Sequence, residues 1–92
     1  MNRIELDISE GEAPEPLIRA TEALQQLPED SYLHITHRME PCRLYDYLER
    51  NGFYVETRRG ESGLCELFIG HDRIDKVKTE IVRLVKDMAR WD

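Results

Sequence analysis

Apolar and polar residues follow seven regular patterns along the chain, and the spacing in each pattern predicts its secondary structure. In residues 3–8, Ile4, Leu6 and Ile8 alternate with charged residues, which is typical of a half-buried strand. Similar strand patterns cover residues 31–37, 53–58 and 64–70. Apolar residues spaced three and four apart predict helices over residues 14–27, 41–50 and 72–91. The order βαβαββα predicts an α+β two-layer sandwich, a four-stranded mixed sheet with helices packed on it, followed by a C-terminal helix.

The last strand of the predicted sheet is apolar on both faces. Leu64 and Phe68 point to one side of the strand over residues 64–70, and the other side carries Cys65, Leu67 and Ile69. A strand of this kind is covered on both sides and lies in the middle of a sheet. We therefore expect the hairpin of residues 53–58 and 64–70 to place its second strand centrally.

The C-terminal helix carries a continuous apolar stripe that must be buried. Its members are Ile74, Val77, Ile81, Leu84, Met88 and Trp91. Because an isolated helix of this length is marginal in water, the stripe needs a partner. We expect a domain over residues 1–70 and a helix over residues 71–92. The stripe packs either on the second face of its own sheet, over residues 64–70, or on a second chain, which would make a homodimer through residues 74–91.

Length and charge restrict the class of protein. Ninety-two residues, 40% of them hydrophobic, are enough for one small domain with one core. The net charge is −6, and residues 1–30 carry eight acidic side chains against two arginines. Such a chain repels phosphate backbones, so we expect no nucleic-acid partner. No apolar run resembles a signal peptide or a membrane span, which favours a cytoplasmic protein without a membrane partner.

The sequence holds little that resembles catalytic or cofactor chemistry. Cys42 and Cys65 are too few for a disulfide framework, and no phosphate-binding glycine loop or catalytic triad is present. His34 and His37 belong to one strand, where alternation sends them to opposite faces and prevents them from sharing a metal. We expect no cofactor, no metal site and no catalytic residue.

One motif gives the chain a resemblance to a known family. The stretch LDISEGEAPEPLIRATEAL resembles the TusA/SirA-like superfamily, in which a first strand leads into Gly-x-x-Cys-Pro-x-Pro and a helix. The resemblance covers residues 3–70 and implies a βαβαββ sandwich. Members of the family carry sulfur as a persulfide on that cysteine. Here Gly11, Pro14 and Pro16 match, but Ala13 stands at the cysteine position, and a methyl group forms no thiolate. The sulfur-carrier activity is therefore not implied.

A second motif narrows the resemblance. The stretch HITHRMEPCRLYDYLERNGFYVE is similar to the cysteine-less group of TusA-like proteins catalogued as domain of unknown function 2249. The residues that carry this similarity are His37, Arg38, Glu40, Pro41, Leu44 and Tyr45. The resemblance spans about three quarters of the chain and leaves the C-terminal helix outside. The group has no established activity, so the resemblance implies a fold and not a reaction.

The sequence also predicts where a contact surface lies. The loops after the first two strands emerge at the same edge of a βαβ unit, where helix N-termini expose unpaired N–H groups. We name this the 11–16/37–42 edge. Its chemically interesting residues are Glu12, Glu15, His37, Arg38, Glu40 and Cys42.

We expect a non-catalytic binding or protein-interaction module that uses this edge to hold a protein partner or a small anionic ligand. A simpler interpretation is a surface ion pair between Arg38 and Glu12 or Glu15. Two alternatives stay open. One is a sulfur-relay or redox accessory protein using Cys42, at a helix start where the dipole favours a thiolate. The other is a small-ligand or metal sensor around His37.

Overall fold

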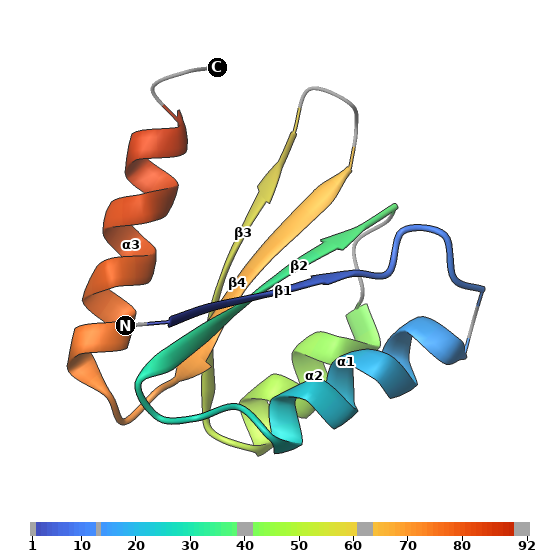
Figure 1. The fold of residues 1–92 in the computed structure, drawn as a ribbon, viewed down its shortest axis with the longest axis horizontal. Coiled ribbons are helices and arrows are strands. Elements are labelled where there is room, and N and C mark those ends of the chain that lie inside the picture. The colour runs from blue at the N-terminus through green and yellow to red at the C-terminus, as the bar shows by residue number, and fades with distance from the viewer. Residues whose placement is uncertain (1, 13, 39–41, 61–63, 90–92) are drawn as a thin grey trace.

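The computed structural model describes residues 2–12, 14–38, 42–60 and 64–89 and contains a single four-stranded sheet flanked by helices (Figure 1). The elements are β1 (Asn2–Asp7), α1 (Glu15–Gln25), β2 (Ser31–His37), α2 (Cys42–Arg50), β3 (Phe53–Arg59), β4 (Cys65–His71) and α3 (Asp75–Ala89). Their order confirms the βαβαββα pattern predicted from hydrophobic spacing.

The strands are arranged in the order β1-β2-β4-β3. β1 runs parallel to β2, whereas β4 is antiparallel to both of its neighbours, β2 and β3. The expected central position of the doubly apolar strand is confirmed, because β4 has a neighbour on each side. Since β1 and β2 are parallel, both end at the same edge of the sheet, with Asp7 beside Thr36.

Helices α1 and α2 cover one face of the sheet and enclose the larger of two apolar cores. Pro16, Ala20 and Leu24 are the buried residues of α1, and they lie one helical turn apart. Gly52 ends α2 with a φ of +73°, a backbone conformation that glycine adopts without strain. The buried members of this core are Ile8, Ala20, Leu24, Leu27, Leu33, Ile35, Leu44, Leu48, Cys65, Leu67 and Ile69.

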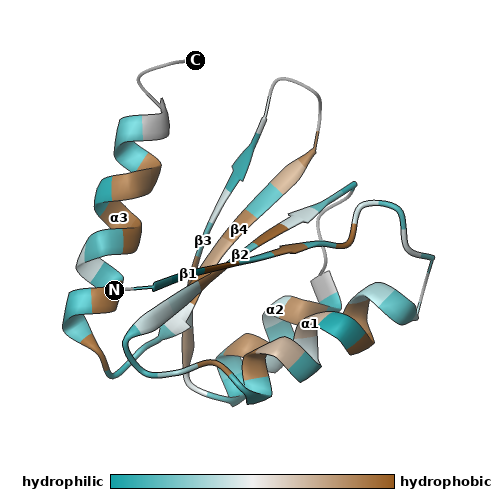
Figure 2. Cartoon of the chain, viewed as in Figure 1, coloured by the Kyte–Doolittle hydropathy of each residue, from teal (hydrophilic) through white to brown (hydrophobic). Residues whose placement is uncertain are grey.

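Helix α3 covers the opposite face and encloses the second core. Val77 and Ile81 of α3 are fully buried against Tyr32 of β2 and Phe68 of β4. Half-buried Tyr54, Ile74, Leu84 and Val85 surround these four residues. Figure 2 shows apolar residues on the helices at both sides of the sheet as well as on its central strands. The molecule therefore has three layers, with the sheet in the middle.

Within the described residues, the apolar stripe of α3 packs on the sheet of its own chain. Trp91 and the side chain of Met88 lie outside the described residues. A homodimer through residues 74–91 stays a prediction.

The helix that hydrophobic spacing places from residue 72 begins at Asp75. Asp72 and Arg73 form a turn instead, in which the Ile74 N–H bonds to the His71 carbonyl at 3.1 Å. The Asp72 carboxylate pairs with the Lys78 ammonium at 3.2 Å, so its charge still lies beside the first turns of the helix.

The close approach of α3 to β4 depends on Gly70. A Cβ atom at this position would lie 2.2 Å from Cγ1 of Val77 and 3.2 Å from Cδ1 of Ile81. We expect Gly70→Ala to displace α3 and to lower the free energy of unfolding by about 1–3 kcal/mol, the usual cost of overpacking a core. Urea unfolding followed by circular dichroism measures the change.

Gly60→Ala is the matched control, because the nearest atoms to a Cβ at Gly60 are 3.7 Å away. Equal losses in the two variants would show that α3 does not pack tightly on β4. Trimming the neighbour as well, in Gly70→Ala/Val77→Ala, should cost less than the sum of the two single losses, since the clashing methyl group is gone.

Candidate functional site

At the 11–16/37–42 edge, a side chain from the loop after β2 is hydrogen-bonded to the backbone of the loop after β1. Arg38, directly after β2, donates a hydrogen bond from Nη2 to the carbonyl oxygen of Gly11 at 2.9 Å. Gly11 lies in the loop between β1 and α1, where its N–H bonds to the Ile8 carbonyl at 3.3 Å. The structure thus brings these two loops together, as expected from the parallel pairing of β1 and β2.

The turn that leaves β1 is fixed by Asp7. Ser9 donates to Oδ1 of Asp7 from its backbone N–H at 2.9 Å and from its hydroxyl at 2.6 Å. These two hydrogen bonds stabilise the carboxylate and lower the pKa of Asp7 below its ordinary value. The loop that carries Gly11 therefore starts from an ordered turn.

Two carboxylates of this edge are exposed and make no ion pair within the described residues. Glu12 precedes α1, and its carbonyl accepts the N–H of Glu15 at 2.9 Å. Glu15 is the first residue of α1, where the helix dipole favours a negative charge. The ion pair considered between Arg38 and Glu12 or Glu15 is not formed, because Arg38 contacts the Gly11 carbonyl instead.

His37 is the buried polar residue of the edge. Its side chain is 9% exposed at the end of β2, and Nδ1 has no hydrogen-bond partner among the described residues. His37 lies opposite Cys65 in the β2–β4 pairing, and Cys65 belongs to the core under α1 and α2. A buried nitrogen without a partner costs about 1–3 kcal/mol, so it marks a position where a missing hydrogen-bond donor or acceptor would fit.

Three positions of interest cannot be placed with the others. Ala13 and Glu40 lie outside the described residues. Cys42 begins α2, but its side chain is not among those described.

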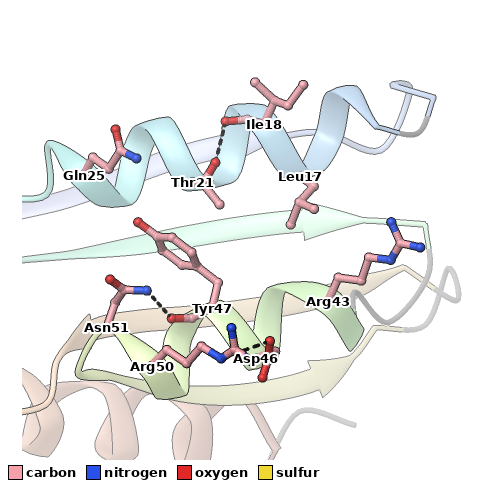
Figure 3. Close-up of a pocket in the computed structure, with 9 residues that line it drawn as sticks. All are labelled: Leu17, Ile18, Thr21, Gln25, Arg43, Asp46, Tyr47, Arg50 and Asn51. Atoms are coloured by element: carbon pink, nitrogen blue, oxygen red, sulfur yellow. Dashed lines mark hydrogen bonds and ion pairs between the residues drawn. The ribbon is translucent and has the colours of Figure 1, made fainter.

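A shallow groove of about 460 Å³ opens between α1 and α2, next to this edge (Figure 3). Leu17 and Tyr47 point into it from the two helices, while Ile18 points away and is 49% exposed. Its rim is polar, and Asp46 and Arg50 form an ion pair there at 3.4 Å. The residues that line the groove are Leu17, Ile18, Thr21, Gln25, Arg43, Asp46, Tyr47, Arg50 and Asn51.

A polar row on the opposite face of the sheet was not predicted from the sequence. Arg3 of β1 donates to Nδ1 of His34 of β2 at 2.7 Å, and Nε2 of His34 lies 3.0 Å from Oε1 of Glu66 of β4. Arg58 of β3 completes the row with its Nε 2.9 Å from Oε2 of Glu66. The Arg3 guanidinium has only hydrogen-bond donors, so Nδ1 of His34 is the acceptor of this hydrogen bond. Nε2 of His34 then carries the ring hydrogen and donates a hydrogen bond to Oε1 of Glu66. The row therefore links all four strands by one side chain each.

The same face holds two further contacts, one of which involves a residue of the row. The His34 ring stacks on Phe68, with the ring centroids 4.5 Å apart and the planes 6° from parallel. Next to it on β3, the Tyr54 hydroxyl donates to Glu56, and this hydrogen bond, helped by burial, raises the pKa of Tyr54 to about 12. Alternation places these side chains on one face, but only the strand order makes them neighbours. The apolar pattern predicts that β4 is central, but it does not say which strands are its neighbours.

The described parts of the chain hold neither a metal-binding cluster nor a membrane-spanning helix. We find no group of three or more histidine, cysteine, aspartate or glutamate side chains arranged to hold a metal ion. Among these residues there is also no helix with the length and apolar composition that crossing a bilayer requires.

Comparison with known proteins gives one clear likeness. No protein-family model and no curated protein sequence matches the chain. The structure is similar to the crystal structure of a SirA-like protein from Desulfitobacterium hafniense, with a TM-score of 0.62 and 26% sequence identity. The match covers 75% of this chain and 95% of the other. This likeness confirms the predicted fold and supports a place in the SirA/TusA-like superfamily.

The two strand histidines give a matched test of the buried nitrogen at the edge. We expect His37→Leu to raise the free energy of unfolding by about 1–3 kcal/mol, because it removes a buried polar atom that has no partner. His34→Leu should lower it by a similar amount, since Arg3 and Glu66 lose their shared partner. Urea unfolding at neutral pH measures both variants. A loss of stability in His37→Leu equal to that in His34→Leu would show that Nδ1 of His37 is satisfied in solution.

Proposed function

We propose that the chain is a non-catalytic protein-interaction module whose 11–16/37–42 edge receives a cationic segment of a partner protein. The observation that carries this proposal is the hydrogen bond from Arg38 to the Gly11 carbonyl at 2.9 Å. It fixes both loops and leaves the carboxylates of Glu12 and Glu15 exposed without an ion pair among the described residues. A preorganised pair of carboxylates binds at a lower entropic cost than a flexible one.

The charge distribution favours a basic partner. Four of the eight acidic side chains of residues 1–30 lie between Asp7 and Glu15, in and beside the loop that forms this edge, so the field there is negative even with Arg38. Such a field attracts cationic segments and speeds their association, and salt weakens the effect. Arg38 is the exposed cation at the edge within the described residues, and it is already bonded to Gly11.

The groove beside the edge supplies the apolar part of the same surface. Leu17 and Tyr47 project into it from α1 and α2. A partner segment whose basic residues meet Glu12 and Glu15 has room for an apolar side chain between these helices. Interfaces of this composition, with an apolar centre and a charged rim, are common in transient complexes.

His37 favours a second candidate function, the binding of a small ligand. Its buried Nδ1 has no partner, and the Arg38 guanidinium follows it in the chain. A small anion or a carboxyl group that reached Nδ1 would satisfy this nitrogen. The two candidate functions can be separated by experiment, because small-ligand binding depends on His37 and peptide binding depends on the exposed carboxylates.

A peptide titration separates these functions. The probe is a synthetic peptide of alternating arginine and leucine, added to ¹⁵N-labelled protein while amide chemical shifts are recorded. We expect shifts at residues 11–16 and in the groove. In Glu12→Gln/Glu15→Gln the affinity for the peptide should fall about 2- to 30-fold. The variant loses two exposed charge pairs, and each contributes about 0.2–1 kcal/mol. Added salt should weaken binding to the unmodified chain more than binding to the variant.

The matched control is Glu22→Gln/Glu49→Gln, which removes two exposed carboxylates from α1 and α2. If control and test variants lose affinity equally, the peptide responds to net charge and the proposed surface is wrong. If instead the effect appears only in His37→Leu, and with acetate or phosphate as the probe, the small-ligand candidate takes its place.

A further inference from the structure

β1 is an edge strand that lies open along one side. Among the described residues it pairs only with β2, and the helices make their main contacts with β2, β3 and β4. Five of its six residues are exposed, whereas most residues of the opposite edge strand, β3, are half-buried. Ile4 is 38% exposed and is one of two large apolar residues that the described surface presents in this way.

The direction of the backbone groups shows what the open side of β1 offers. The N–H groups of Asn2 and Ile8 bond to the Asp30 and Thr36 carbonyls, toward β2. Successive residues of a strand point their backbone groups to alternate sides, so the N–H and C=O groups of Arg3, Glu5 and Asp7 face outward. They form a regular row of donors and acceptors that has no partner within the described parts of the chain.

β1 carries charged side chains but lacks the other features that usually protect a sheet edge. Its pairing with β2 runs from Asn2 to Asp7 without a bulge, and the segment holds no proline, glycine or lysine. On β3, by contrast, Tyr54 and Glu56 bond to each other and Arg58 pairs with Glu66 of β4. On β1, Arg3 also bonds to His34 and pairs with Glu5 at 3.2 Å. The Arg3 and Glu5 side chains are nevertheless 39% and 68% exposed, whereas the Arg58 side chain is only 17% exposed, so the charges of β1 stay within reach of another strand.

We propose that β1 pairs antiparallel with β1 of a second copy of this chain, with Ile4 opposite the partner's Ile4. In this register Arg3 lies opposite the partner's Glu5, and Glu5 lies opposite the partner's Arg3. Opposite charges at directly facing positions stabilise a strand pair, and the two-fold axis makes the contact twice. The sheets of the two copies then form one continuous sheet.

The backbone and side-chain geometry agree in this register. Arg3 and Glu5 are outward-facing residues, so each facing pair exchanges two backbone hydrogen bonds. Ile4 falls at the position between them, where facing side chains approach most closely, and the apolar surface it exposes is buried against its copy. The neighbouring register, centred on Glu5, places two carboxylates directly opposite each other and is disfavoured by their repulsion.

The test uses two charge-reversal variants, each of which should prevent dimerisation alone and restore it when the two are mixed. Sedimentation velocity of the unmodified chain should show a concentration-dependent rise from the mass of one chain to that of two. Arg3→Glu places a carboxylate opposite the partner's Glu5, and Glu5→Arg places a guanidinium opposite the partner's Arg3, so each variant alone should stay monomeric. An equimolar mixture should dimerise again, because each chain of the mixed pair then meets the opposite charge. Circular dichroism checks that both variants fold.

The matched control is the pair Arg19→Glu and Glu22→Arg, which makes equal charge changes on the exposed surface of α1 and should leave dimerisation unchanged. Glu5→Pro is a second variant, since it removes an outward N–H that β2 does not use, and it should abolish the dimer in a folded chain. The proposal is overturned if the unmodified chain is monomeric at every concentration. A dimer that persists in Arg3→Glu, Glu5→Arg and Glu5→Pro overturns it as well and directs attention to residues 74–91.

Discussion

The burial of β4 on both faces is the constraint on which the rest of the structure depends. Leu67 and Ile69 enter the core under α1 and α2, and Phe68 enters the core under α3. All three side chains are fully buried. A strand without a polar face requires cover on both sides, and the chain supplies it from two separate segments. Helix α3 is therefore part of the core, since without it Phe68 and Tyr32 would face water.

This arrangement leaves the ends of β1 and β2 available for contact with other molecules. The helices pack on the two faces of the sheet. The loops that follow β1 and β2 meet at one edge, where the Arg38 side chain bonds to the Gly11 carbonyl. Stability thus comes from the middle of the sheet, and the proposed contact surface lies at its rim. Function in small α/β domains is commonly separated in this way, with loops positioned by a rigid scaffold.

Sequence periodicity was sufficient for the elements and their order. The doubly apolar segment 64–70 predicts a strand that is buried on both faces, and β4 has that environment in the structure. The alternation in residues 3–8 predicts a half-buried strand, but Ile8 is buried while Ile4 is 38% exposed, because β1 is an edge strand. The start of α3 was misplaced by three residues, because local hydrogen bonds at His71 and Ile74 decide where a helix begins and periodicity does not. The TusA/SirA-like resemblance predicted the fold correctly, and the SirA-like structure supports it.

The candidate site was less accessible to sequence reasoning. The meeting of the two loops followed from the parallel pairing of β1 and β2, but the partner of Arg38 did not. A carboxylate was the simpler expectation, and a backbone carbonyl is the observed acceptor. The row from Arg3 through His34 and Glu66 to Arg58 was missed altogether, because it depends on β4 lying between β2 and β3. Hydrophobic spacing predicted that β4 is central, but it did not identify the neighbours of β4 or the register that sets these contacts.

Native mass spectrometry of untagged protein, purified without oxygen or added metal, tests the central claim of binding without chemistry most directly. The account predicts the mass of the bare chain, 10.9 kDa, or twice that mass. An added sulfur atom or a tightly held metal would contradict it. If the added sulfur is lost in Cys42→Ser, Cys42 carries it and replaces the family's cysteine, whose position is held by Ala13. If an added metal is lost in His37→Ala, the metal is bound at His37.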